Sequence, residues 1–232
     1  MQIVILAGGF ATRLKPLSNN LPKSLVQIQG KPFIYHQLNK LINLGFSKFV
    51  FCLGHLSEPL ESYLNTLNKW KNYFTYSFEK EPLGTGGAII NAYSLLEDDF
   101  LVINGDNIFL GDYHSAINNY FSSNIESLVF LRKVKENGNV MFNQSSKRIK
   151  KYLRDCSICQ YEDIGVKIFK KRIFVNYIDE ISISLEDNIY HDLINDNKLY
   201  GILVNNEILD IGSFKSIEET NKYFARNLNK TL

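Results

Sequence analysis

The sequence predicts an α/β fold, in which a mainly parallel sheet is flanked by helices and carries a small antiparallel sub-lobe. In the first half of the chain, apolar runs of strand length alternate with segments of helical period, the pattern of a parallel sheet covered by helices. After Ile125 the pattern changes to short extended pieces, which indicate antiparallel strands. The 232 residues are 45% hydrophobic and contain no repeat or Pro/Ser-rich linker, so a single domain over 1–232 is expected.

Strands and helices are expected to follow one another in turn along the first half of the chain. The helix over 32–44 begins with Pro32, whose fixed φ suits the first turn of a helix, and ends before Gly45. Ser57 is expected to cap the next helix, because its hydroxyl can accept a hydrogen bond from a free backbone N–H. In chain order, the predicted elements are a strand over 1–6, a helix over 32–44, a strand over 48–53, a helix over 57–67, a strand over 73–78, a helix over 86–96 and a strand over 100–104.

The second half of the chain is predicted to add shorter strands and two more helices. Its apolar runs are brief and separated by polar segments, as in antiparallel strands joined by turns. The predicted elements are strands over 127–132, 140–143, 149–153 and 164–169, a helix over 184–195, a strand over 199–204 and a helix over 214–228.

The balance of charge argues against nucleic acid or a membrane as a partner. With 26 basic and 24 acidic residues, the formal charge is +2, too small for a protein that binds polyanions through phosphate contacts alone. No stretch approaches the roughly 20 apolar residues that are needed to span a bilayer. The first residues carry no basic leader before an apolar segment, so a cytoplasmic protein is expected.

The cysteines and histidines do not form a recognisable site. Cys156 and Cys159 make a lone C-x-x-C without a second pair for zinc, and an odd count of three argues against a framework of disulfides. The four histidines fall in separate elements and have no serine or cysteine partner in a recognisable pattern. A hydrolase triad is therefore not expected.

A glycine-rich loop follows the first predicted strand. Residues 6–17 read L-A-G-G-F-A-T-R-L-K-P-L, and Pro22-Lys23 come soon after. Paired glycines let backbone N–H groups approach an anion closely, while Arg13 and Lys23 add charge that could hold a triphosphate. The spacing is neither that of the P-loop nor that of the dinucleotide-binding fingerprint. The string therefore predicts a phosphate-binding loop of another kind.

Two further motifs stand near the ends of predicted strands. Residues 79–88 read E-K-E-P-L-G-T-G-G-A and lead into a helix. The carboxylate of Glu79 can accept two hydrogen bonds and would suit the N–H groups of guanine, whereas an amide suits thymine or uracil. Residues 102–107 read V-I-N-G-D-N, which puts Asp106 at the carboxyl end of a strand, where ligands bind in open α/β sheets.

Together these strings resemble the signature of the sugar-1-phosphate nucleotidylyltransferases, which contains L-A-G-G-x-x-T-R-L-x-P-L, then P-K, E-x-x-P-L-G-T-(A/G)-G and G-D. The resemblance implies that Arg13, Lys23 and Asp106 are catalytic, with Arg13 assisting the departure of pyrophosphate and Lys23 bridging phosphate groups. It also implies Mg²⁺ bound to Asp106 and Asp210, since Asp210 stands in the late D-I-G of the family and Mg²⁺ takes few protein carboxylates. The nucleotide-binding residues that it implies are Leu6, Ala7, Gly8, Gly9, Thr12, Arg13, Lys23, Glu79, Pro82, Gly84 and Thr85.

The resemblance is less complete on the side of the acceptor. Residues 161–166, Y-E-D-I-G-V, are similar to the segment that holds the sugar hydroxyls, which makes Glu162 and Asp163 the candidate hydrogen-bond acceptors. Where the family often carries F-x-E-K, residues 152–155 read Y-L-R-D. Either Arg154 supplies the cation for the sugar phosphate, or other residues hold that phosphate. The sugar-binding residues implied are Asn104, Gly105, Arg154, Glu162, Asp163 and Gly165.

The resemblance implies a Rossmann-like fold of the nucleotide-diphospho-sugar transferase type, with a nucleotide-binding half over about 1–124 and a sugar-binding half over about 125–232. The implied substrates are a nucleoside triphosphate and a sugar 1-phosphate, which give a nucleotide sugar and pyrophosphate. Among compact members, the strings look most like those of heptose-1-phosphate and mannose-1-phosphate guanylyltransferases of surface-polysaccharide synthesis, which use GTP.

Several alternatives stay open at this point. Uridylyl or cytidylyl transfer, to another sugar 1-phosphate or to phosphocholine, shares much of the pattern, and so does a non-catalytic subunit that senses nucleotides. From the length, no C-terminal β-helix acetyltransferase of the kind that bifunctional relatives carry is expected. A homo-oligomer is compatible with the sequence, which does not determine the oligomeric state.

Overall fold

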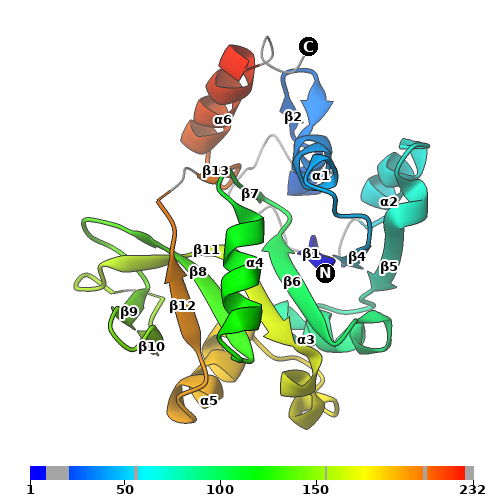
Figure 1. Cartoon of the computed structure of the whole chain (residues 1–232). Coiled ribbons are helices and arrows are strands. Elements are labelled where there is room, and N and C mark those ends of the chain that lie inside the picture. The colour runs from blue at the N-terminus through cyan, green and yellow to red at the C-terminus, as the bar shows by residue number, and fades with distance from the viewer. Residues whose placement is uncertain (9–20, 55–56, 155, 206–207, 228–232) are drawn as a thin grey trace.

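One mixed β-sheet forms the centre of the fold (Figure 1). A computed structural model describes residues 1–8, 21–54, 57–154, 156–205 and 208–227, and within these ranges nine strands make up this sheet. In sheet order the strands are β5 (Phe74–Phe78), β4 (Phe49–Leu53), β1 (Gln2–Leu6), β6 (Asp99–Asn104), β11 (Tyr161–Lys170), β8 (Ser127–Lys133), β12 (Tyr200–Leu203), β10 (Arg148–Tyr152) and β9 (Val140–Asn143).

The strand directions confirm part of the predicted architecture and correct another part. Strands β5, β4, β1 and β6 are all parallel, as the alternation of strands and helices predicts. Beyond β6 the sheet is mixed, because β11 runs antiparallel between β6 and β8, while β12 is parallel to β8. The antiparallel strands therefore continue the main sheet. The ten residues of β11 make this continuity possible, since the strand is long and mostly buried and pairs along both of its edges.

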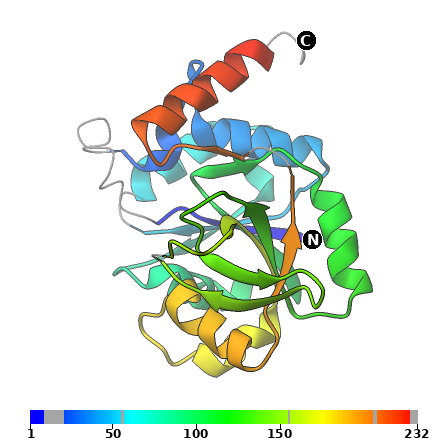
Figure 2. The ribbon, with the colours of Figure 1, turned by 90° about the vertical axis from the view of Figure 1, so that its left-hand side faces the viewer.

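Helices cover both faces of the sheet (Figure 2). One face packs against α1 (Phe33–Asn43), α2 (Ser57–Thr66) and α4 (Tyr113–Ser122), and the other against α3 (Gly84–Asn91) and α5 (Tyr190–Asn195). Helix α1 shows why these segments fold as they do, because Ile34, Leu38 and Leu41 recur at helical spacing and are fully buried against the sheet. The central strands β1, β4 and β6 are apolar and buried on both sides over most of their length, as expected where a sheet is covered on both faces.

A smaller cluster of short elements brings the C-terminal part of the described chain against residues 23–33 and 107–109. It consists of η2 (Lys23–Leu25), the hairpin β2 (Gln27–Ile28) and β3 (Lys31–Pro32), the antiparallel pair β7 (Asn107–Phe109) and β13 (Ile208–Asp210), and helix α6 (Phe214–Asn227). Buried Ile28, Phe33 and Ile211 belong to its apolar core. Figure 1 shows α6 beside β2, although the two are far apart in the sequence. Within this cluster, residues 208–210 pair with β7, the short strand that follows β6 in the chain.

Most predicted elements are observed, but the short strands β2, β3, β7 and β13 were not predicted, and three further differences concern helices. The helix predicted over 86–96 is divided into α3 and a 3₁₀ turn, η4 (Tyr93–Leu95). The helix predicted over 184–195 begins with a π-helical turn, η6 (Leu185–Ile189), before α5. Helix α4 was not predicted, although Asp112 caps it by accepting a hydrogen bond from the N–H of Ser115. Further short turns are η3 (Lys71–Tyr73) and η5 (Lys171–Tyr177).

The cysteine pair also differs from the sequence-based expectation. Cys156 and Cys159 form a disulfide within the turn that joins β10 to β11, although the sparse cysteine count argues against disulfides. Only three residues of separation bring the two side chains together, so this bond closes a local turn and does not link distant segments. None of the helices in the described ranges is long and apolar enough to cross a membrane.

Candidate active site

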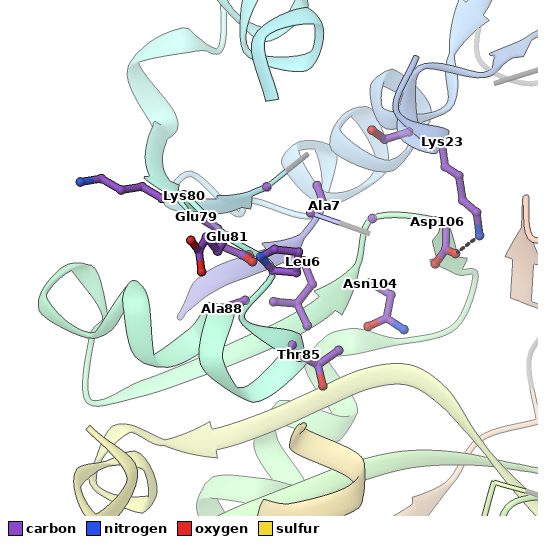
Figure 3. A pocket seen from close by; sticks show the side chains of 16 residues that line it. Leu6, Ala7, Lys23, Glu79, Lys80, Glu81, Thr85, Ala88, Asn104 and Asp106 are labelled. Carbon is purple, nitrogen blue, oxygen red and sulfur yellow. Dashed lines mark hydrogen bonds and ion pairs between the residues drawn. The ribbon is translucent and has the colours of Figure 1, made fainter. Parts of the chain in front are cut away.

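A pocket of about 480 Å³ opens at the carboxyl ends of the parallel strands β1, β4 and β6, beside the start of α3. This is the edge at which ligands bind in open α/β sheets. Figure 3 shows Glu79, Lys80 and Glu81 on one side of it and Lys23 with Asp106 on the other. The predicted site residues that line this pocket are Leu6, Ala7, Gly8, Lys23, Glu79, Pro82, Gly84, Thr85, Asn104, Gly105 and Asp106.

Gly8 and Gly54 allow the segments after β1 and β4 to approach each other closely next to Glu79. A Cβ on Gly8 would lie 3.0 Å from Oε1 of Glu79 and 3.1 Å from the backbone nitrogen of Gly54. The other carboxylate oxygen of Glu79 accepts a hydrogen bond of 3.2 Å from the N–H of Leu83. Burial raises the pKa of Glu79, and the Leu83 hydrogen bond offsets part of that rise. Glu79 therefore presents an oriented, partly buried carboxylate to the pocket.

Lys23 and Asp106 lie at the other end of the pocket, and the segment that carries Asp210 pairs with the strand after Asp106. Nζ of Lys23 lies 3.4 Å from Oδ2 of Asp106, whose side chain is 32% exposed. Asp210 comes from β13, which pairs with β7 so that Asp210 lies opposite Asn107, the residue after Asp106. The N–H of Ile211 donates to the backbone oxygen of Asp106 at 3.2 Å, which ties the two segments together. The tertiary structure thus places Asp210 on a segment next to Asp106, but Asp210 is not among the residues that line the pocket, and its Oδ1 accepts a hydrogen bond of 2.9 Å from the N–H of Gly212.

The carboxylates of this region fit a hard cation for which substrate and water supply most of the ligands. Asp106 and Asp210 lie on adjacent segments, and Mg²⁺ takes one or two protein carboxylates besides phosphate and water oxygens. Elsewhere too, the described residues include no group of three or more His, Cys, Asp or Glu side chains that could hold a metal ion. A metal ion held by Asp106 and Asp210 would therefore need phosphate or water oxygens as its other ligands.

The glycines of residues 84–87 contact the backbone carbonyl of Ile183, in the second half of the chain. The N–H groups of Gly86 and Gly87 both donate to the oxygen of Ile183 at 3.0 Å. Gly84 has a φ of +75°, and a Cβ there would lie 2.7 Å from the same oxygen. These glycines therefore permit the close approach of residues 183–185, in addition to lining the pocket through Gly84.

Replacing Gly84 by alanine is expected to destabilise the protein more than the same change at Gly30. Both glycines have a left-handed φ, +75° and +76°, but nothing lies within 4 Å of a Cβ on Gly30. Gly30→Ala should therefore cost only the strain of that backbone conformation, about 1–2 kcal/mol, whereas Gly84→Ala should add about 1–3 kcal/mol for overpacking against Ile183. Urea unfolding of both variants measures the difference, and equal losses of stability would contradict the steric role of Gly84.

Asn104 and Gly165 pack against each other at the edge of the pocket. Asn104 lines the pocket at the end of β6, and its backbone oxygen accepts a hydrogen bond of 3.0 Å from the side chain of Gln37. Gly165 has a φ of +79°, and a Cβ there would lie 2.8 Å from Nδ2 of Asn104. Gly165 therefore lets β11 bend against Asn104, at the point where its register with β8 shifts.

The remaining predicted acceptor residues lie apart from the pocket lining. Glu162 and Asp163 are neighbours in β11, so their side chains leave the strand on opposite faces. Glu162 forms an ion pair of 2.6 Å with Arg132, whereas Asp163 is directed into the protein, with 4% of its side chain exposed. Arg154 is 70% exposed and forms an ion pair with Asp187.

Lys167 and Glu186 are charged residues near the pocket that the sequence analysis missed. Lys167 lies 3.7 Å from Oδ2 of Asp163 and 3.3 Å from Oε1 of Glu186. Burial lowers the pKa of Lys167, but the two carboxylates raise it more, so the net shift is upward. Burial likewise raises the pKa of Glu186, and Lys167 and Thr85 reverse that shift. A lysine within the apolar run from Ile164 to Phe169 was the available signal, because lysine is rarely buried without a partner.

Three predicted residues lie outside the described residues. They are Gly9, Thr12 and Arg13, which belong to the glycine-rich loop after β1. Their predicted roles in binding and in the departure of pyrophosphate stay predictions. Gly8, the first glycine of the pair, lies at the described edge of this loop and lines the pocket.

Comparison with known proteins identifies similar sequences and structures over nearly the whole chain. The sequence profile of a family described as "Nucleotidyl transferase" matches residues 2–227. The D-glycero-alpha-D-manno-heptose 1-phosphate guanylyltransferase of Aneurinibacillus thermoaerophilus is 30% identical over 220 residues, covering 91% of this chain and 93% of that protein. Mannose-1-phosphate guanyltransferase beta-B of Xenopus laevis is 28% identical over 227 residues, which are 93% of this chain. The match covers 62% of the length of that relative.

A solved structure shares the fold. HddC from Yersinia pseudotuberculosis, crystallised in complex with GMP-PN, superposes with a TM-score of 0.84 and 26% sequence identity. The alignment covers 96% of this chain and 99% of that chain. The arrangement of the sheet and its helices is therefore that of HddC along almost its full length.

Proposed function

Since this chain belongs to the nucleotidyl transferase family, we propose that it transfers the nucleotidyl group of a nucleoside triphosphate to a sugar 1-phosphate. The observation that carries the proposal is the pocket at the carboxyl ends of β1, β4 and β6, where Lys23 and Asp106 lie opposite the carboxylate of Glu79. One end offers charges for phosphate groups, and the other offers hydrogen-bond acceptors for a base.

The reaction needs no side-chain nucleophile. An oxygen of the sugar phosphate attacks the α-phosphorus, a new P–O bond forms, and the bond between the α-phosphorus and the bridging oxygen breaks, so that pyrophosphate leaves. Lys23 holds phosphate oxygens, and Arg13 stabilises the departing pyrophosphate. Catalysis then consists of positioning the two phosphates and stabilising charge.

Magnesium is part of this proposal. Asp106 and Asp210 would hold Mg²⁺, which supplies positive charge to phosphate oxygens when it is bound. Before the nucleotide arrives, the ammonium group of Lys23 neutralises Asp106. Lys23 and Asp106 thus belong to one electrostatic unit, so each is expected to be required for turnover.

We further propose that the nucleotide is GTP and the acceptor is mannose 1-phosphate or a heptose 1-phosphate, for the synthesis of surface polysaccharide. The carboxylate of Glu79 supports guanine, because it can accept hydrogen bonds from both the N1–H and the N2–H groups of that base. The relatives described above support the same choice, since two of them are guanylyltransferases of these acceptors.

Pyrophosphate release tests this function directly. The purified protein would be assayed with Mg²⁺ and five nucleoside triphosphates, each combined with a panel of sugar 1-phosphates and with phosphocholine. We expect release with GTP and mannose or heptose 1-phosphate, and loss of release when Mg²⁺ is chelated. Release with UTP or CTP alone would support uridylyl or cytidylyl transfer instead. A protein that binds GTP but releases no pyrophosphate with any acceptor would support a nucleotide-sensing subunit.

A further inference from the structure

Lys167 is the one charged residue in the described part of the chain that is buried as a whole. It lies in the middle of β11, with Val102 of β6 and Val129 of β8 beside it in the sheet. Only 2% of its side chain is exposed, and its ammonium group lies between Asp163 and Glu186, at 3.7 and 3.3 Å. These carboxylates come from β11 and η6, so the lysine joins two segments of the second half of the chain.

A buried ammonium group is a costly way to hold two segments together. Removing a charged group from water costs several kcal/mol, and well-packed apolar side chains of similar volume are often as stable or more stable. Apolar residues occupy the neighbouring positions of β11, such as Val166 and Ile168. A role for Lys167 in fixing a specific geometry therefore explains its position better than a contribution to stability alone.

The contacts of Lys167 lead to two walls of the pocket. On one side, Oε2 of Glu186 accepts a hydrogen bond of 2.6 Å from the hydroxyl of Thr85, which also accepts one from the N–H of Leu185. Thr85 lines the pocket. Figure 3 shows Thr85 on the side of the pocket that faces the later part of the chain. The position of Thr85 thus depends on Glu186, whose other oxygen, Oε1, accepts a hydrogen bond from Nζ of Lys167.

The second wall is reached through Asp163. Its Oδ1 accepts a hydrogen bond of 2.8 Å from the N–H of Gly165, and its Oδ2 accepts one from the hydroxyl of Tyr190. Gly165 packs directly against the side chain of Asn104, which lines the pocket. Lys167 therefore holds one carboxylate that positions Thr85 and another that positions the segment behind Asn104.

We propose that Lys167 is a positioning residue for the acceptor end of the pocket, where it sets the placement of Thr85 relative to Asn104. This proposal rests on the proposed function. It adds that the sugar lies between these two residues, so it assigns Thr85, which the sequence analysis places among the nucleotide-binding residues, to the sugar side of the pocket. Lys167 acts through Glu186 and Asp163, and no contact between Lys167 and substrate is invoked. Arg154, one of the two alternatives that the sequence analysis leaves open for holding the sugar phosphate, is exposed and paired with Asp187.

Binding of a nucleoside diphosphate and of its sugar derivative separates this role from a purely structural one. Calorimetry would give the Kd values of GDP and GDP-mannose, and of UDP and UDP-glucose, without requiring turnover. For Lys167→Met we expect the Kd of the nucleoside diphosphate to stay within about twofold, while that of the sugar nucleotide rises at least tenfold. Lys167→Arg retains the charge and is expected to recover most of that loss.

The matched control is Lys170→Met, on the same strand. Lys170 forms an ion pair of 3.0 Å with Asp99 and is away from the pocket lining, so its loss should change neither Kd. If Lys167→Met does not fold, Glu186→Gln is used in its place. This change leaves Lys167 paired with Asp163, so no buried charge loses its partner. It should weaken the binding of the sugar nucleotide selectively.

Two results would overturn these ideas, and they are distinguishable. If Lys167→Met folds and loses no more affinity for the sugar nucleotide than for the nucleoside diphosphate, Lys167 has no positioning role. If Lys167→Met does not fold, the same result in Glu186→Gln leads to the same conclusion. If the wild-type protein binds none of the four nucleotides, the proposed function fails, and this proposal fails with it.

Discussion

Replacing Asp106 by asparagine is expected to lower the rate of pyrophosphate release by about three orders of magnitude while the fold persists. The carboxylate stands at the end of β6, pairs with Lys23 and is 32% exposed, so its charge acts in the pocket and not in the core. Asparagine keeps the size of the side chain but removes the negative charge that would hold Mg²⁺. Assays of pyrophosphate release at saturating substrates and thermal unfolding would measure both effects.

The matched control for this variant is Asp196→Asn. Asp196 also pairs with a lysine, Lys198, at 3.3 Å, but its side chain is 63% exposed and does not line the pocket. Turnover should stay at the wild-type level in this control. A wild-type rate in Asp106→Asn would contradict both the catalytic role of Asp106 and the proposed metal site.

Replacing Glu79 by glutamine is expected to lower kcat/KM for GTP by about 100-fold, with a much smaller effect on UTP. A carboxylate accepts from both the N1–H and the N2–H groups of guanine, whereas an amide offers one acceptor and turns a donor towards the other group. The amide oxygen can still accept the hydrogen bond from Leu83, so the loop should keep its shape. Competition between GTP and UTP in a single assay would measure the change in preference.

The pH dependence of GTP binding provides a second measurement for the same residue. Because burial raises the pKa of Glu79, its carboxyl group becomes protonated at a higher pH than an exposed glutamate. Protonation removes an acceptor, so the KM for GTP should rise as the pH falls through that raised pKa. Glu79→Gln should lack this rise, while Glu58→Gln, an exposed change on α2, should retain it. The same pH profile in wild type and Glu79→Gln would exclude Glu79 from base recognition.

Local patterns were sufficient to predict the parallel half of the sheet. Strands such as β4 are short apolar runs, and α1 repeats its buried residues at helical spacing, so each can be recognised without its partners. Helix α4 shows the limit of this reasoning. Tyr113, Ala116 and Tyr120 do recur at helical spacing, but aromatic and polar residues between them weaken the contrast on which a prediction depends.

The candidate site divides in the same way. The nucleotide side was predicted because its residues stand in contiguous strings, and those that the structure describes line one pocket. The acceptor side was predicted less completely because its geometry depends on strand direction and on contacts between distant segments. Whether Glu162 or Asp163 is directed inward is decided by how β11 fits between β6 and β8.

What followed from the chain alone was the succession of strands and helices along its first half, the phosphate-binding strings and the family to which they point. These features depend on residues close together in sequence, where periodicity and glycine content are sufficient signals. Only the tertiary structure placed β11 in the middle of the sheet, paired the strand of Asp210 with the strand after Asp106 and joined Lys167 to Thr85 through Glu186. These contacts span roughly a hundred residues of chain and arise from packing, which no local pattern encodes.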